Sequence, residues 1–144
     1  MDGNPILAKL RLLFEGDPGV RKVANDPTLT AELLLLFRMM LADGAVSEQE
    51  LETFRRICKD AFGIGEDSFR GVVRYLQDFG YETTAPQALE MFRAMPLDRR
   101  HQLVRHLAEI AKADAQLHEH EVKILKRTVE FLDVNASEAL GEKR

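Results

Sequence analysis

Four carboxylates, those of Asp43, Glu50, Asp114 and Glu121, have the residue type and the spacing of ligands for a hard cation. The first two lie within residues 42–51, A-D-G-A-V-S-E-Q-E-L. The second two lie within residues 113–122, A-D-A-Q-L-H-E-H-E-V, where the Ala, the Asp and both Glu residues recur seventy-one positions later. Because carboxylate oxygens are the ligands that Ca²⁺ and Mg²⁺ prefer, we predict a divalent-cation site if the two turns meet in space.

Helix capping is the alternative explanation for these carboxylates. Ser47 and Glu50 have the S-x-x-E form of a capping box, whereas His118 takes the place of the capping hydroxyl before Glu121. Capping therefore explains the first Glu better than the second. Each Asp ends a helical run, where the helix dipole disfavours an anion by roughly 0.3–1 kcal/mol. That placement favours the cation, although a local Asx-turn also accounts for an Asp there.

Histidine-based and catalytic sites have weaker support. His118 and His120 carry nitrogen ligands suited to a transition metal, but residues two apart do not share a helix face, so we expect exposed polar side chains. The chain contains no G-x-S-x-G, glycine-rich phosphate loop or Cys–His arrangement, and we predict that it is not an enzyme. The single cysteine, Cys58, rules out an intramolecular disulfide and lies on a helical apolar stripe, so we expect a buried, inert thiol.

The elements that must position the acidic turns are all expected to be helices. Apolar residues recur with helical spacing in segments near 5–15, 28–42, 48–62, 66–79, 85–95, 99–113 and 118–132, with a single extra turn near 20–24. No segment alternates with period two, so no strand is expected. The 28–42 segment is apolar around nearly its whole circumference, which is typical of a helix buried at the centre of its domain.

The predicted fold is therefore an all-α, single-domain bundle of about seven helices. It contains an internal duplication of a helix–acidic turn–helix unit, whose two copies should pack around a pseudo-twofold axis. The domain is expected to span residues 1–134, with its core at 29–134, and residues 135–144 should form a loose or frayed tail.

Charge and hydropathy limit the classes of partner. The 144-residue chain has a net charge of -4, which argues against nucleic-acid binding, and Arg99, Arg100 and Arg105 are expected to lie on a solvated helix face. The longest apolar run, 33–42, is interrupted by Arg38 and is about half of the ~20 residues that a membrane span requires. With no basic region near Met1, we expect a cytoplasmic protein without direct membrane insertion.

The doubled motif resembles the TerB-like tellurite-resistance family. The resemblance covers residues 29–134, including F-G-I at 62–64 and L-D-V at 132–134, which follow the two units. It is also similar to the TerB-like domain that precedes the J-domain in membrane-anchored co-chaperones. The resemblance implies an all-α bundle linked to bacterial stress and tellurite resistance, with acidic residues at Asp43, Glu50, Asp114 and Glu121. The sequence departs from the family pattern at Ala115, which replaces the second Gly, and at His118.

Two functions follow as hypotheses. In the first, the protein is non-enzymatic and binds or senses a divalent cation through its paired acidic turns in a stress response. In the second, it is a protein-interaction scaffold with structural carboxylates and no metal. Three of the five methionines, Met39, Met40 and Met91, would then line an adaptable apolar surface, although core filling explains each of them as well.

Overall fold

The helix α3, Pro27–Met40, is buried over most of its circumference. It begins where the side chain of Asp26 accepts a hydrogen bond from the Leu29 backbone N–H at 3.1 Å, with Pro27 at the first turn. Its buried residues include Leu29, Thr30, Ala31, Glu32, Leu33, Leu34, Leu36, Phe37, Met39 and Met40. Because these positions surround the helix, α3 must be covered by neighbours on all sides, as its sequence predicted.

The computed structural model describes residues 17–41, 46–79, 85–113 and 119–135. Over these residues it contains α-helices and no strand, which confirms the all-α single domain. The helices are α2 Pro18–Ala24, α3 Pro27–Met40, α4 Glu48–Phe62, α5 Glu66–Phe79, α6 Ala85–Ala94, α7 Leu97–Lys112 and α8 Glu119–Leu132. The predicted helix near 5–15 and most of the predicted tail lie outside the described residues, and the internal duplication stays a prediction. None of the described helices combines the length and the apolar character needed to cross a membrane.

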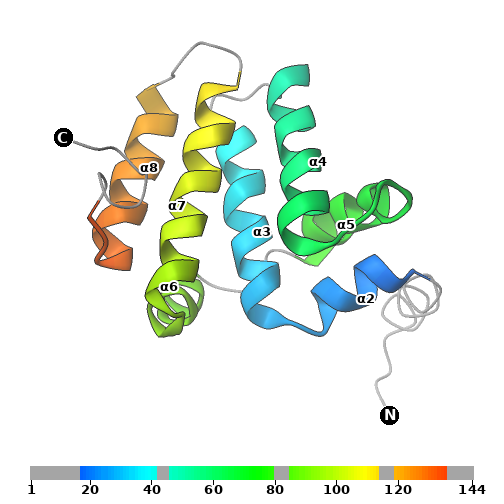
Figure 1. Ribbon diagram of the computed structural model, residues 1–144, viewed down its shortest axis with the longest axis horizontal. Helices are drawn as coiled ribbons and strands as arrows, with labels where there is room; N and C mark the ends of the chain where they lie inside the picture. Colours follow the sequence, from blue (N-terminus) through cyan, green and yellow to red (C-terminus); the bar gives the residue numbers. More distant parts are fainter. Residues whose placement is uncertain (1–16, 42–45, 80–84, 114–118, 136–144) are drawn as a thin grey trace.

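The two helix pairs that flank the acidic turns form one bundle (Figure 1). α3 and α7 pack against each other in the middle, α4 packs on both of them, and α8 packs on α7. α6 lies at the end of the bundle where α3 and α7 begin, and α2 and α5 pack together beside the lower part of α4. The bundle therefore places α4 and α8 on opposite flanks of the central helices.

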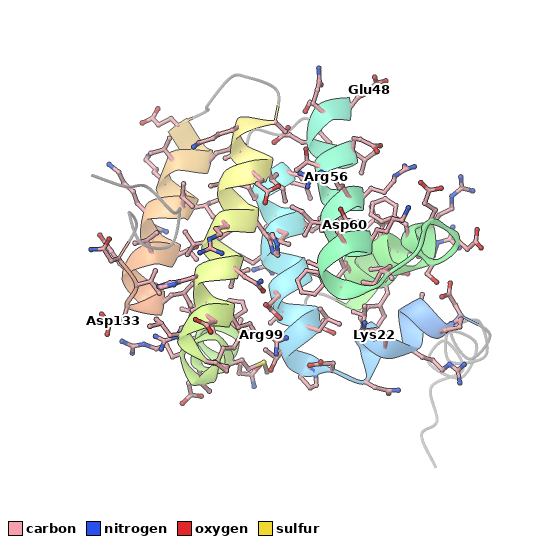
Figure 2. All side chains as sticks on the ribbon, in the orientation of Figure 1. Lys22, Glu48, Arg56, Asp60, Arg99 and Asp133 are labelled. Atoms are coloured by element: carbon pink, nitrogen blue, oxygen red, sulfur yellow. The ribbon has the colours of Figure 1, made fainter. Side chains whose placement is uncertain are left out.

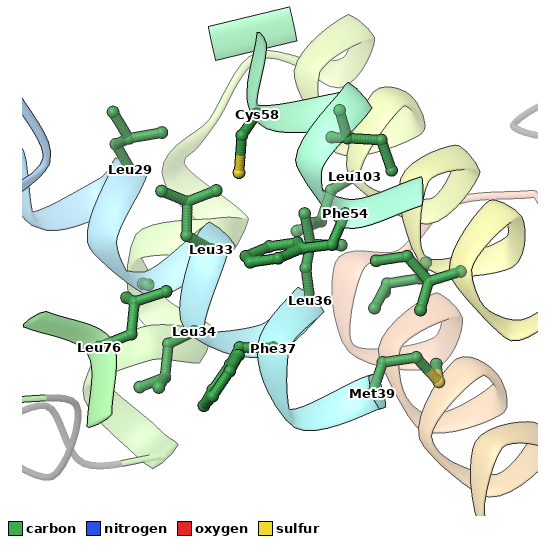
Figure 3. Packing of buried hydrophobic residues seen from close by; sticks show 14 of the residues in the cluster. Leu29, Leu33, Leu34, Leu36, Phe37, Met39, Phe54, Cys58, Leu76 and Leu103 are labelled. Atoms are coloured by element: carbon green, nitrogen blue, oxygen red, sulfur yellow. The ribbon is translucent and has the colours of Figure 1, made fainter. Parts of the chain in front are cut away.

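The core is built around α3 (Figure 3). Leu33, Leu36 and Met39 of α3 are fully buried, and Phe54 enters from α4 with its ring centroid 6.3 Å from that of Phe37. Met40 is also fully buried, so Met39 and Met40 fill the core and do not line an exposed apolar surface. Burial of this kind is what holds short helices together, because isolated helices of their length are marginal in water.

Two glycines fix how the helices meet. Gly63 adopts a left-handed conformation, φ 68°, and ends α4 with a hydrogen bond from the Ile64 N–H to the Cys58 carbonyl at 2.8 Å. Gly19 lets α2 approach α5 closely, since a Cβ atom there would lie 2.3 Å from the Cβ of Ser68. The segment near 20–24 is longer than the single turn expected, because the Asp17 side chain accepts from the Gly19 N–H at 3.0 Å and so starts a helix.

Replacing Phe54 by Ala should lower the free energy of unfolding by about 3–5 kcal/mol, because a buried ring is removed from the centre of the core and leaves a cavity. Urea denaturation of the wild type and the variant measures this change. Phe131→Ala is the matched control, since Phe131 is 44% exposed and should lose far less. Equal losses in the two variants would contradict the core assignment.

Candidate functional site

The helix ends that flank the two acidic turns all lie at one end of the bundle. Figure 1 shows the last turns of α3 and α7 and the first turns of α4 and α8 at this shared end, opposite α6. The sequence could not decide this, because two copies of a helix pair can also place their turns at opposite ends. Asp43 and Asp114 themselves lie outside the described residues, as do His118 and the side chain of His120.

Glu50 caps the helix that it begins. Its Oε1 accepts hydrogen bonds from the Ser47 backbone N–H at 3.3 Å and from the Ser47 hydroxyl at 3.0 Å. The Ser47 Oγ in turn accepts from the Glu50 N–H at 3.0 Å, which completes the predicted capping box. The Glu50 side chain is nevertheless only 1% exposed, whereas a first-turn Glu is ordinarily solvated.

Glu121 has the same position and the same burial in the other helix pair. It is the third residue of α8, as Glu50 is the third residue of α4, and it is also 1% exposed. The first residues of the two helices, Glu48 and Glu119, are exposed instead. The structure thus turns one carboxylate of each acidic turn into the bundle and the other into solvent, at the same end of the molecule.

An open cleft of about 410 Å³ lies beside this end. It is bordered by Glu48, Glu52 and Arg56 on one face of α4 and by Ala113 at the end of α7. The guanidinium of Arg56, which is labelled in Figure 2, donates to the Glu109 carboxylate at 2.6 Å and so ties α4 to α7. Glu52 was not among the ligands predicted from the sequence, although its spacing of four residues from Glu48 places both on one helix face.

The described part of the chain does not by itself assemble a complete metal centre. Among residues 17–41, 46–79, 85–113 and 119–135 there is no group of three or more His, Cys, Asp or Glu side chains arranged to hold an ion. Of the four predicted ligands, the structure places Glu50 and Glu121 and brings them to one end of the bundle.

A second polar cleft, of about 460 Å³, lies between α2, α3, α4 and α7. Arg99 donates through Nε and Nη2 to one carboxylate oxygen of Glu32, at 3.1 and 2.5 Å, and Glu32 is 2% exposed. Burial raises the pKa of Glu32, while the ion pair with Arg99 opposes that shift. Lys22 donates to the Phe62 carbonyl in the same cleft.

The basic cluster expected on a solvated face is partly used inside the fold. Arg99 pairs with buried Glu32, and Arg100 donates to the carbonyls of Met95, at 3.2 Å, and Leu132, at 2.7 Å. Arg100 thereby joins the start of α7 to the end of α8. These contacts correct the sequence-based expectation for Arg99 and Arg100, because each guanidinium is hydrogen-bonded to protein acceptors and only partly solvated.

Cys58 is the buried thiol that its apolar stripe predicted. It is fully buried beside α3, and burial raises the pKa of the thiol to about 12 (Figure 3). Since the thiolate is the reactive form, Cys58 is inert near neutral pH.

Replacing Ser47 by Ala should destabilise the protein by about 1 kcal/mol, within a range of roughly 0.5–2 kcal/mol, because the Glu50 N–H loses its acceptor and the buried Glu50 carboxylate loses a donor. Chemical denaturation measures the difference. Exposed Gln49→Ala, two residues further on, is the control and should change stability by less than about 0.5 kcal/mol. An unchanged free energy of unfolding in Ser47→Ala would show that the capping box contributes nothing to stability.

Acidification should destabilise the protein partly through His106. Burial lowers the pKa of this ring below its ordinary value. The nearby charges of Arg56 and Arg105 lower the pKa further, and that of Glu109 raises it. The neutral ring therefore contributes stability above the unfolded pKa, and this contribution is lost as pH falls through the folded pKa. His106→Gln should flatten the dependence of the urea midpoint on pH between about 7.5 and 5, and Gln102→Ala should keep it. Identical slopes for wild type and His106→Gln would contradict this assignment.

Comparison with known proteins identifies one matching family. A family model described as "Tellurite resistance protein TerB" matches residues 29–141, the greater part of the chain. No curated protein and no solved structure matches the sequence. The matched range begins two residues into α3 and includes both helix pairs with the acidic turns between them. The chain belongs to the TerB tellurite-resistance family.

Proposed function

We propose that this protein is a non-enzymatic stress-response protein of the tellurite-resistance type that binds or senses a divalent cation through its paired acidic turns. The observation that carries the proposal is the matched burial of Glu50 and Glu121, each the third residue of its helix and each 1% exposed at the same end of the bundle. Asp43 and Asp114 would complete the ligand set, with the cation of the Ca²⁺ or Mg²⁺ type that oxygen ligands favour.

A bound cation would add to the contacts that helix capping supplies to these buried carboxylates. Removing a carboxylate from water costs several kcal/mol, whereas a helix N-terminus returns about 0.3–1 kcal/mol. A charge-assisted hydrogen bond adds roughly 1.5–3 kcal/mol, and Glu50 accepts two bonds from Ser47. A divalent cation offsets the burial of both carboxylates, and capping by Oε1 does not exhaust the lone pairs of Glu50.

Titration calorimetry with Ca²⁺, Mg²⁺, Mn²⁺ and Zn²⁺ tests the proposal on the full chain. The wild type should bind at least one ion, and a free concentration of 100 times Kd should stabilise the fold by about 2.7 kcal/mol. Glu50→Gln/Glu121→Gln and Asp43→Asn/Asp114→Asn should each abolish the heat. Glu48→Gln/Glu119→Gln is the matched control, because both residues are exposed at the first position of the same helices, and it should retain binding. Absence of heat and of any thermal shift in the wild type, with all four ions, rejects the cation.

A protein-interaction scaffold without metal is the second candidate, and the complete capping box of α4 favours it. The box accounts for Glu50 through contacts with Ser47 alone. If this candidate is right, Glu50→Gln/Glu121→Gln lowers the unfolding free energy, and the wild type gives no binding heat in any metal titration. The two candidates therefore give opposite results in the same calorimeter.

A further inference from the structure

An apolar cavity of about 270 Å³ is lined by residues of α3, α6 and α8, none of which belongs to the acidic turns. α3 lines it with residues at 31, 34, 35 and 38, and α8 with residues at 124, 127, 128 and 131. Both sets follow the i, i+3, i+4, i+7 spacing of a single helix face. α6 contributes Ala88, Leu89 and Phe92. Three helices thus converge on one hollow whose walls are mostly aliphatic or aromatic.

The charged groups of the lining are two arginines, Arg38 of α3 and Arg127 of α8. Both are exposed, and neither makes a hydrogen bond or ion pair with any residue in the described part of the chain. The one polar neutral side chain, Thr128, already donates to the Ile124 carbonyl at 2.8 Å. The cavity therefore has an apolar interior, in which the Thr128 hydroxyl is already hydrogen-bonded. Two cationic groups lie on its lining.

We propose that this cavity binds a medium-chain alkyl carboxylate, with the chain against α3, α6 and α8 and the carboxylate held by Arg38 and Arg127. Guanidinium groups recognise a carboxylate by paired N–H donors, and the mostly apolar lining excludes a ligand that is charged throughout. The net charge of the protein is -4, so attraction of an anion depends on these two arginines rather than on the overall field. This site is independent of the cation proposal, because it shares no residue with the acidic turns.

The volume limits the length of the chain. At roughly 30 Å³ for a group the size of a water molecule, 270 Å³ corresponds to about nine groups of that size. Each buried methylene should raise the affinity about fourfold. Affinity should therefore rise steeply from butyrate to octanoate and level off near decanoate, where the cavity is full. Adsorption to an open apolar surface has no such limit, and its affinity continues to rise with each added carbon.

Two-dimensional NMR of the isotope-labelled full chain, titrated with butyrate, octanoate, decanoate and dodecanoate below their micelle concentrations, tests the proposal. Decanoate should shift amide resonances of α3, α6 and α8 together, and decyltrimethylammonium, which has the same chain length and the opposite charge, should bind at least tenfold more weakly. No shifts in these helices, equal binding of the cationic amphiphile, or affinity that keeps rising through dodecanoate at the same increment overturns the proposal.

Substitutions distinguish the contribution of the ligand's carboxylate from that of its alkyl chain. Arg38→Gln/Arg127→Gln should weaken decanoate binding about tenfold or more and leave neutral decanol unchanged, because only the carboxylate needs the guanidinium groups. Ala88→Phe should weaken both ligands, since Ala88 is half-buried at the cavity wall and a ring there takes up the space. Arg93→Gln, an exposed α6 arginine outside the lining, is the matched control. Equal affinities of the double arginine variant and the control for decanoate would overturn the assignment of the carboxylate, with thermal unfolding of each variant confirming that it is folded.

Discussion

Burial of α3 on nearly every side is the constraint on which the rest of the structure depends. A helix whose apolar residues include Leu33, Leu36, Phe37 and Met40 exposes little of its surface to water, chiefly at Arg38. It must be covered, and α2, α4, α5, α6 and α7 each pack against it. The positions of the clefts and of the acidic end of the bundle follow from the order in which these helices surround it.

Polar contacts then fix which helices lie next to one another, because apolar packing alone does not determine this. Arg99 and buried Glu32 join α7 to α3, Arg56 and Glu109 join α4 to α7, and Arg100 reaches the last carbonyl of α8. The first of these pairs is the most demanding, because removing Arg99 leaves the buried Glu32 carboxylate without the partner of its charge, although the 39% exposure of the Arg99 side chain lets solvent screen part of that loss. The exposed pair between Arg56 and Glu109 contributes far less to stability, but it holds α4 against α7 beside the acidic end.

The fold separates three chemical environments within one small bundle. The first turns of α4 and α8, which carry Glu48, Glu50, Glu119 and Glu121, lie at the end of the bundle where α3 and α7 finish. A mixed cleft that contains the ion pair of Arg99 with buried Glu32 lies between α2, α3, α4 and α7, and an apolar cavity with two arginines lies against α8. A single helix serves all three, since α3 gives Glu32 to the mixed cleft and Arg38 to the cavity, and it ends beside the acidic turns. The proposed cation and the proposed carboxylate ligand consequently occupy sites joined by one buried helix.

Local signals in the sequence determined the helices, their caps and the type of chemistry. The helical spacing of apolar residues predicted the all-α fold, Ser47 and Glu50 predicted the capping box, and the stripe around Cys58 predicted its burial, because each depends on neighbours within a few residues. Tertiary structure decided that Glu121 is as buried as Glu50, that Arg99 meets Glu32 sixty-seven positions away, and that α3, α6 and α8 enclose a cavity. These facts depend on how whole helices pack. The residues next to a side chain in the sequence do not determine which distant side chain will contact it.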